Sequence, residues 1–254
     1  MKTEEIVKEL IRLGINPPRI IYYEETGSTN TEAKEYAKSN PKSNETVVFI
    51  ANSQTAGRGR RGRSFVSVKG AGIYMSILSY PKESVADATA VTAKAAVALS
   101  RAIEEICKRS ISIKWVNDIY LNGKKLAGIL TEGEVDKNGK LLYQVVGMGI
   151  NIYKNAISDE ISNIATSIEG ELNYAPNRSV LAARMIKEFL STPDNCYDDY
   201  KNKSFLIGKK VTVVKLSESY EATVIDINPD FSLQIERNGE EERLFTGEIS
   251  LKIR

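Results

Sequence analysis

The stretch KWVNDIYLNGKKLAGIL (114–130) holds two short apolar runs joined by the pair Asn122-Gly123. Asn-Gly is favoured in two-residue hairpin turns, because a type I′ turn needs positive φ at both central residues. We therefore expect the chain to fold back on itself here, so that Asp118 shares a pocket with a lysine after the turn. The other interpretation is a charged, exposed hairpin tip, which we favour for Lys124 over Lys125.

The sequence around this stretch alternates strand and helix patterns. Strands are predicted over 46–53, 72–80 and 111–116, and a second Asn-Gly turn leads into a buried strand over 143–152. Apolar residues at helical spacing predict helices over 3–13, 31–39, 86–108 and 179–190. Together these elements predict a mixed domain of sheet and helices.

From about Phe205 the pattern changes to short β-rich runs separated by turns such as Asn228-Pro229-Asp230. Such spacing is typical of a small five-stranded barrel of about 50 residues. We expect a boundary near residue 204, with domains at 1–204 and 205–254.

Composition excludes several kinds of chemistry. The 254-residue chain has no histidine, which rules out Ser-His-Asp and Cys-His catalysis, histidine metal sites and a histidine base. Its cysteines, Cys107 and Cys196, lack CxxC spacing, so we expect neither a disulfide framework nor a zinc site. The N-terminal residues 1–14 lack the apolar stretch of a secretory signal, and no apolar run reaches the roughly 18 residues of a membrane span. We expect a cytoplasmic protein.

The stretch QTAGRGRRGRSF (54–65) lies between two predicted strands. Its glycines allow close approach of backbone N–H groups to an anion, and its arginines add forked donors for phosphate or carboxylate. The net charge of the chain is only +2, so the basic charge is local. A nucleotide-binding loop, a nucleic-acid contact and a solvated basic loop all remain open on composition alone.

Two further motifs are candidates for ligand contact. GMGIN (147–151) ends a predicted buried strand with glycines that permit close approach to a nucleotide, but it is not a dinucleotide fingerprint. Ser28-Thr29-Asn30 precedes a predicted helix, where hydroxyls and free N–H groups serve either a polar ligand or plain helix capping.

Taken in order, these motifs resemble the biotin protein ligases. The motifs are GSTN (27–30), QTAGRGRRGR (54–63), KWVND (114–118), KKLAGIL (124–130), GMGIN (147–151), ATS (165–167) and GEISL (247–251). The resemblance implies an α+β fold, in which a mixed β-sheet backed by helices, as in class II synthetases and biotin/lipoate ligases, precedes a small C-terminal SH3-like β-barrel. It implies that domain 1–204 is catalytic and binds biotin and ATP.

The resemblance also implies a two-step reaction. Biotin and ATP form biotinyl-5′-AMP with Mg²⁺ present, and a lysine of a biotin carboxyl carrier protein or domain then displaces AMP. Family members are often homodimers. This chain lacks the N-terminal winged-helix domain of some members, so we expect no specific DNA binding and no transcriptional regulation.

Residue roles carry over motif by motif. Biotin-binding residues would be Ser28, Thr29, Asn30, Gln54, Gly57, Arg58, Gly59, Arg60, Lys125 and Gly128. ATP-binding residues would be Arg58, Arg60, Arg61, Arg63, Asn117, Lys125 and Asn151. Catalytic roles would fall to Lys125, which bridges the biotin carboxylate and the α-phosphate, to Arg60 near the phosphate, and to Asp118, which orients or deprotonates the incoming amine. No residue is expected to bind a metal on its own.

Two positions depart from the family pattern: Phe65 replaces the usual tryptophan, and Val116 replaces a common proline. Two other functions compete with biotin ligation. Lipoate protein ligases share the fold and adenylate chemistry, but are expected to carry a histidine and a GGG run that this chain lacks. A nucleic-acid-binding module would use the Arg/Gly loop alone and would bind in a salt-sensitive way.

Overall fold

The computed structural model describes residues 1–41, 43–80, 88–215, 218–245 and 250–253. The helices are α1 (Thr3–Arg12), α2 (Thr29–Ser39), α3 (Ala88–Cys107), α4 (Ile168–Leu172), α5 (Arg178–Ser191) and α6 (Tyr197–Lys203). The strands of the larger sheet are β1 (Arg19–Tyr23), β2 (Val47–Ala51), β3 (Gly72–Ser79), β4 (Ser112–Lys114), β5 (Asp118–Leu121), β6 (Lys124–Val135) and β7 (Leu141–Asn151). None of the described helices is long and apolar enough to cross a bilayer.

The larger sheet has seven strands in the order β1-β2-β3-β7-β6-β5-β4. β1 and β2 run parallel, and every other neighbouring pair is antiparallel. The predicted strands at 46–53, 72–80, 111–116 and 143–152 and both Asn-Gly hairpins are present. Elements β1, α4 and α6 have no counterpart among the predicted ranges.

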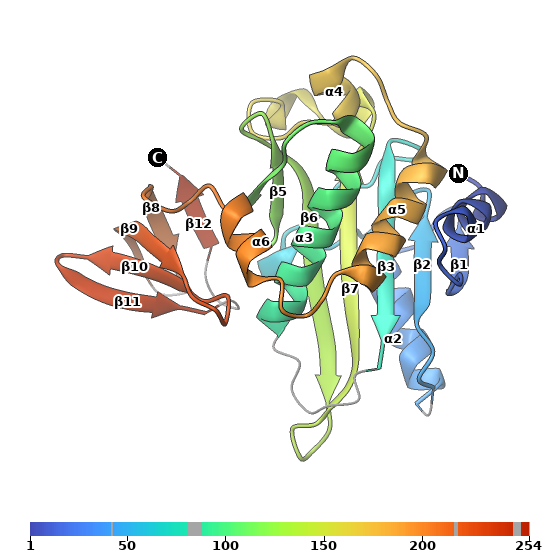
Figure 1. Cartoon of the computed structure of the whole chain (residues 1–254), viewed down its shortest axis with the longest axis horizontal. Coiled ribbons are helices and arrows are strands. Elements are labelled where there is room, and N and C mark those ends of the chain that lie inside the picture. Colours follow the sequence, from blue (N-terminus) through green and yellow to red (C-terminus); the bar gives the residue numbers. More distant parts are fainter. Residues whose placement is uncertain (42, 81–87, 216–217, 246–249, 254) are drawn as a thin grey trace.

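Helices cover both faces of this sheet (Figure 1). α3 and α5 pack together across one face and bury the main apolar core, which includes Ile73, Ile77 and Ile150. α2 covers part of the opposite face over a smaller cluster that includes Phe49 and Val145. The predicted mixed sheet backed by helices is therefore confirmed. The first residues of the predicted helix over 86–108, residues 86–87, lie outside the described part of the chain.

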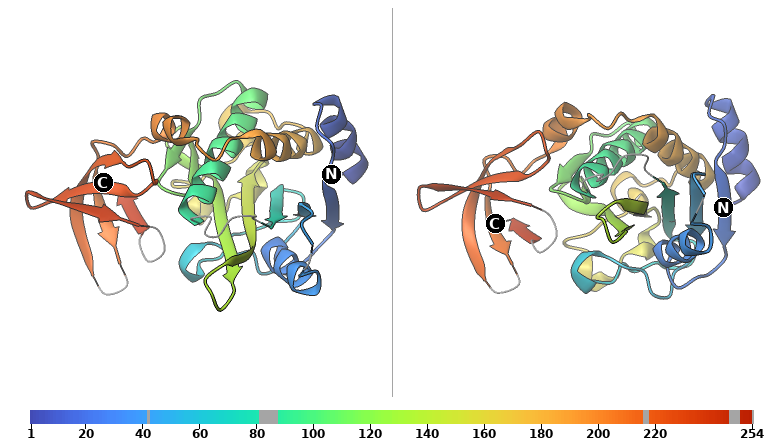
Figure 2. Two further views of the ribbon diagram at one scale, coloured as in Figure 1. Left: turned by 60° about the horizontal axis from the view of Figure 1, so that its bottom comes forward. Right: turned by 90° about the horizontal axis from the view of Figure 1, so that it is seen from below.

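Beyond α6 the chain forms a second, five-stranded antiparallel sheet. Its strands are β8 (Lys210–Val214), β9 (Ser219–Ile227), β10 (Leu233–Arg237), β11 (Glu240–Leu244) and β12 (Ser250–Ile253), in the order β11-β10-β9-β8-β12. This agrees with the predicted SH3-like unit, which stands at one end of the larger sheet (Figure 2). The domain boundary after residue 204 stays a prediction. Residues 247–249 of the GEISL motif lie outside the described residues.

Candidate active site

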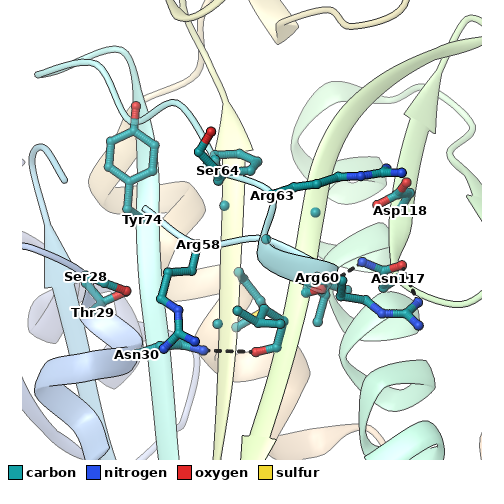
Figure 3. A pocket seen from close by; sticks show the side chains of 18 of the residues that line it. Ser28, Thr29, Asn30, Arg58, Arg60, Arg63, Ser64, Tyr74, Asn117 and Asp118 are labelled. Atoms are coloured by element: carbon teal, nitrogen blue, oxygen red, sulfur yellow. Dashed lines mark hydrogen bonds between the residues drawn. The ribbon is translucent and has the colours of Figure 1, made fainter. Parts of the chain in front are cut away.

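A cavity opens on the α2 side of the larger sheet, beneath the loop over 54–65 (Figure 3). Alternate residues of β7 face this side of the sheet. Along the strand these residues are first Val145, which packs under α2, and then Gly147 and Gly149. Because the two glycines have no side chains, the apolar layer under α2 ends there and leaves room for the cavity.

Most residues predicted from the motifs line this cavity. They are Ser28, Thr29, Asn30, Gln54, Arg58, Gly59, Arg60, Arg61, Arg63, Asn117, Asp118, Lys125 and Gly128. Two predicted residues, Gly57 and Asn151, are not among its lining. Motif reasoning assigned no ligand role to several others that are, namely Ser64, Tyr74, Met75, Lys114, Ile129, Leu130 and Met148. Strand alternation alone marks Tyr74, because it lies two residues before Ser76 on the α2 face of β3.

At one end of the cavity, α2 meets Gln54 and Ser76 in a hydrogen-bond chain. The Gln54 side chain accepts from the Thr29 backbone N–H at 2.8 Å and donates to Ser67 Oγ at 2.8 Å. The Ser76 hydroxyl lies 2.7 Å from Thr29 Oγ1 and 2.6 Å from Asn30 Oδ1. Thr29, Asn30, Ser67 and Ser76 are buried and Gln54 is half-buried, so their donor and acceptor directions are set before any ligand arrives.

Ser28 occupies the N-cap position of α2, but its side chain makes no capping hydrogen bond. It is 4% exposed and lines the cavity. The Gln54 side chain accepts a backbone N–H at this end of α2 instead. The Ser28 side chain therefore does not cap the helix, which was one of the two roles considered from the sequence.

The glycines of this region make room for protein side chains. A Cβ at Gly147 would lie 2.2 Å from Asn30 Oδ1, and one at Gly149 would lie 2.6 Å from the Phe65 ring. A Cβ at Gly57 would lie 2.3 Å from the Phe65 carbonyl oxygen. Gly57 therefore lets the Arg/Gly loop close on itself, and Gly147 and Gly149 let Asn30 and Phe65 lie against β7.

Asp118 and Lys125 form a short ion pair at the opposite side of the cavity. Lys125 Nζ lies 2.6 Å from Asp118 Oδ1, and the two side chains are 35% and 21% exposed. Asp118 pairs with Gly128 across the β5–β6 ladder, whereas Tyr120 pairs with Lys125. A bulge between these pairs accommodates Leu126, which is fully buried. The bulge places Lys125 on the same sheet face as Asp118.

Lys124, the other lysine of the hairpin, points away from this site. Its Nζ donates to the Ser162 carbonyl at 2.9 Å in an exposed position, as we favoured from the sequence.

Two arginines of the loop, Arg60 and Arg63, lie on the Asp118 side of the cavity. Arg60 donates to Asn117 Oδ1 at 3.1 Å, and Asn117 Nδ2 donates to the Ile129 carbonyl at 2.9 Å. Burial lowers the pKa of Arg60, and the Asp118 carboxylate opposes this shift. Figure 3 shows Arg63 extending over the cavity toward Asp118.

Lys114 and Trp115 complete this side of the cavity. Burial lowers the pKa of Lys114, and Asp118 again opposes the shift. Trp115 is 4% exposed, and its indole N–H donates to the Phe231 carbonyl at 2.8 Å. It is therefore a core residue that also borders the cavity.

Asn151 and Phe65 make contacts within the protein. Asn151 Nδ2 donates to the Thr166 carbonyl at 3.2 Å and so ties β7 to the ATS segment. Phe65 packs edge-on against Tyr74, with ring centroids 6.3 Å apart, and lines the cavity. Phe65 thus forms part of the cavity wall beside Tyr74.

Comparison with known proteins places the chain in a family. Residues 22–151 match the model described as the Biotin/lipoate A/B protein ligase family. The chain belongs to this family. Its fold also matches a solved structure, a biotin protein ligase from Aquifex aeolicus in complex with biotin and ATP. The TM-score is 0.77 at 25% identity, over 93% of this chain and 99% of that one.

Two relatives extend the family match over most of the chain. The bifunctional ligase/repressor BirA of Bacillus subtilis (strain 168) is 30% identical over 268 residues, covering 98% of this chain and 80% of the relative. The biotin--[acetyl-CoA-carboxylase] ligase of Mycobacterium tuberculosis is 28% identical over 216 residues, covering 81% of this chain and 78% of the relative. Family membership thus covers both the larger sheet and the C-terminal unit.

Proposed function

We propose that this family member is an ATP-dependent biotin protein ligase. It joins biotin and ATP as biotinyl-5′-AMP and transfers biotin to a lysine of a biotin carboxyl carrier protein or domain. One observation carries the proposal: among the described residues that line the cavity, six are cationic and Asp118 alone is a carboxylate. The cations are Arg58, Arg60, Arg61, Arg63, Lys114 and Lys125. Such an excess of positive charge suits the meeting of a carboxylate with a triphosphate.

In the first step, a biotin carboxylate oxygen attacks the α-phosphorus of ATP, and the bond to pyrophosphate breaks. Two anions must come together, so the barrier falls if cations lie between them. We assign this role to Lys125, with Arg60 beside the phosphate. Arg61 and Arg63 would bind the rest of the triphosphate, and Asn117 would hold Arg60 in place through their 3.1 Å hydrogen bond.

In the second step, the neutral ε-amine of the acceptor lysine attacks the acyl carbon of the adenylate, and AMP leaves. The amine must lose a proton as the bond forms, and a positioned carboxylate accelerates such a step. Asp118 is the carboxylate available at the cavity, so we assign it the orientation and deprotonation of the amine.

The polar ring of biotin would bind at the far end, against the Ser28 hydroxyl and the hydrogen-bond chain of Thr29, Asn30 and Gln54. The buried groups there have fixed donor and acceptor directions, which favour a ligand with matching polar atoms. Gly59 and Gly128 would line the path between the two ends. Gly57 would contribute indirectly, by allowing the loop to fold over the ligand. Asn151 would contribute by fixing the ATS segment beside the nucleotide.

The proposal includes Mg²⁺. Among the described residues there is no group of three or more Asp, Glu, Cys or His side chains arranged to hold a metal. Mg²⁺ commonly binds through one or two carboxylates together with substrate phosphates and water. Asp118 fits that limited role, so the ion would enter with ATP, neutralise phosphate charge and need no protein cage.

We also propose that the enzyme is a cytoplasmic homodimer. Both cysteines are free and buried, which suits a reducing compartment where ATP is available. The homodimer rests on the resemblance to ligases that dimerise, and sedimentation equilibrium of the purified chain tests it.

The deciding experiment is biotin-dependent exchange of labelled pyrophosphate into ATP. We expect exchange with biotin, none with lipoate, and a loss of at least about 100-fold in Lys125→Ala, the range for a group that stabilises developing charge. Lys124→Ala is the matched control, because that neighbouring lysine points away from the cavity, and it should stay within about twofold of wild type. Exchange with lipoate in place of biotin, or equal loss in the two variants, would overturn the proposal.

A further inference from the structure

Glu132, on β6, contacts residues of two other segments beside the cavity. Its Oε2 accepts from Asn30 Nδ2 at 2.8 Å, and its Oε1 accepts from Lys34 Nζ at 2.8 Å. The same Oε1 lies 3.3 Å from Arg58 Nη1. Glu132 is not among the described residues that line the cavity, so its influence on a ligand must pass through these neighbours.

The first neighbour is Asn30, whose carboxamide orientation depends on Glu132. Its Nδ2 donates to Glu132 and to the Leu130 carbonyl at 3.2 Å, while its Oδ1 faces the Ser76 hydroxyl. A flipped carboxamide would set an oxygen against a carboxylate and a carbonyl, which is strongly unfavourable at a buried position. Glu132, together with the Leu130 carbonyl and the Ser76 hydroxyl, therefore fixes the orientation of the Asn30 carboxamide.

The second neighbour is Arg58 of the Arg/Gly loop. Figure 3 shows its side chain turned down from the loop toward Asn30. Its Nη1 lies 3.3 Å from the Glu132 carboxylate. The Arg58 side chain is 49% exposed, so this ion pair restrains its position only in part. The ion pair connects the loop to β6 at the end of the cavity assigned to biotin.

The charge balance of this group favours a stable carboxylate. Glu132 is 20% exposed and faces two cations, Lys34 and Arg58. Burial raises the pKa of Glu132, but the hydrogen bonds from Lys34 and Asn30 outweigh it, so the pKa lies below its usual value. The carboxylate is thus charged at neutral pH, and it can accept from Asn30, Lys34 and Arg58 together.

We propose that Glu132 is a positioning residue for biotin. It fixes the carboxamide of Asn30 and holds Arg58 over the same end of the cavity, so that the loop and α2 meet the ligand in one arrangement. This inference rests on the proposed function.

Glu132→Gln tests it, because the substitution keeps the size of the side chain and removes its charge. We expect the KM for biotin in pyrophosphate exchange to rise about tenfold, the scale of one charge-assisted hydrogen bond. The kcat should change by less than about twofold and the KM for ATP should not change, since the lost interaction serves ground-state binding of biotin.

Glu134→Gln is the matched control. Glu134 lies two residues further along β6, accepts from the Tyr143 hydroxyl at 2.6 Å and is not among the cavity-lining residues described. All three kinetic constants should stay within about twofold of wild type, as for a substitution away from a binding site. A purely structural effect on β6 would appear in both variants and would lower their melting temperatures alike.

Lys34→Met provides a second test that leaves the carboxylate in place, in case Glu132→Gln does not fold. It removes one of the bonds that restrain Glu132, and a rise of about threefold in the KM for biotin is expected. Both variants matching Glu134→Gln would overturn the inference. Absence of biotin-dependent exchange in the wild type would instead overturn the proposed function, so the two failures are distinct.

Discussion

At the scale of single residues, the Asp118–Lys125 ion pair carries the chemistry assigned to the site. The pair is partly exposed, so it contributes little to stability. An incoming biotin carboxylate and phosphate compete with Asp118 for the Lys125 ammonium. Their arrival would release Asp118 to meet the acceptor amine, which couples ligand binding to the second step.

Asp118→Asn should therefore separate the two half-reactions. We expect transfer from preformed biotinyl-5′-AMP to a carrier protein to fall about 100-fold, because a positioned base typically contributes that much. Pyrophosphate exchange should fall less than about tenfold, since Asn retains an oxygen that accepts from Lys125. Single-turnover transfer and pyrophosphate exchange on the same preparation measure the two losses. Equal losses would show that Asp118 does not act selectively in transfer.

At the scale of elements, different residues stabilise the N-terminus of α2 and offer a hydroxyl to a ligand there. Gln54, 25 residues away in sequence, accepts the Thr29 backbone N–H, and the adjacent Ser28 hydroxyl is not used for capping. A distant side chain thus caps the helix, and the local hydroxyl stays available to a ligand.

Two substitutions test this division. Gln54→Ala should lower the free energy of unfolding by about 1 kcal/mol, the usual cost of a lost helix cap, and should also raise the KM for biotin. Ser28→Ala should change stability by less than about 0.5 kcal/mol, since no capping bond is lost. Its effect should appear only in the KM for biotin. Urea unfolding and pyrophosphate exchange measure the two quantities, and a large stability loss in Ser28→Ala would contradict the assignment.

At the scale of the whole molecule, hydrogen bonds join the C-terminal sheet and α6 to the cavity wall and the loop. Trp115 donates to the Phe231 carbonyl between β9 and β10, and the Tyr200 hydroxyl of α6 donates to the Val116 carbonyl at 3.1 Å. Arg61 of the loop donates to the Val214 carbonyl of β8 at 2.9 Å. The small sheet therefore helps to place the KWVND segment and the loop.

Trp115→Phe should disturb both stability and the site. It leaves the Phe231 carbonyl without its donor, which typically costs about 1–3 kcal/mol, and it should raise the KM for ATP. Tyr197→Phe is the control, because it removes a comparable bond between α6 and the small sheet, from the Tyr197 hydroxyl to the Ile227 carbonyl at 2.7 Å. We expect a similar loss of stability there without a change in the KM for ATP. If both variants raised the KM for ATP equally, the effect would come from a general loss of stability and not from the position of Trp115.

Sequence patterns alone determined the main elements and most of the site. Asn-Gly pairs, apolar periodicity and turn residues are local signals, and they predicted most strands of the larger sheet, the long helices and the C-terminal β unit, but not β1. The motifs named most cavity-lining residues, because a ligand loop needs glycine and cationic side chains wherever it lies in the fold. Short elements such as α4 and α6 have too few residues for a periodic signal.

Only the tertiary structure decided how these residues meet. The bulge at Leu126 sets Lys125 on the face of Asp118, whereas regular pairing would have turned it toward the core. The absence of side chains at Gly147 and Gly149 lets Asn30 and Phe65 pack against β7. Trp115 donates a hydrogen bond to Phe231, which lies 116 residues away in sequence. Glu132 lies outside all the motifs, so no sequence pattern indicated its role. Register, packing against glycine and long-range hydrogen bonds depend on residues far apart in the chain, and local sequence patterns do not encode them.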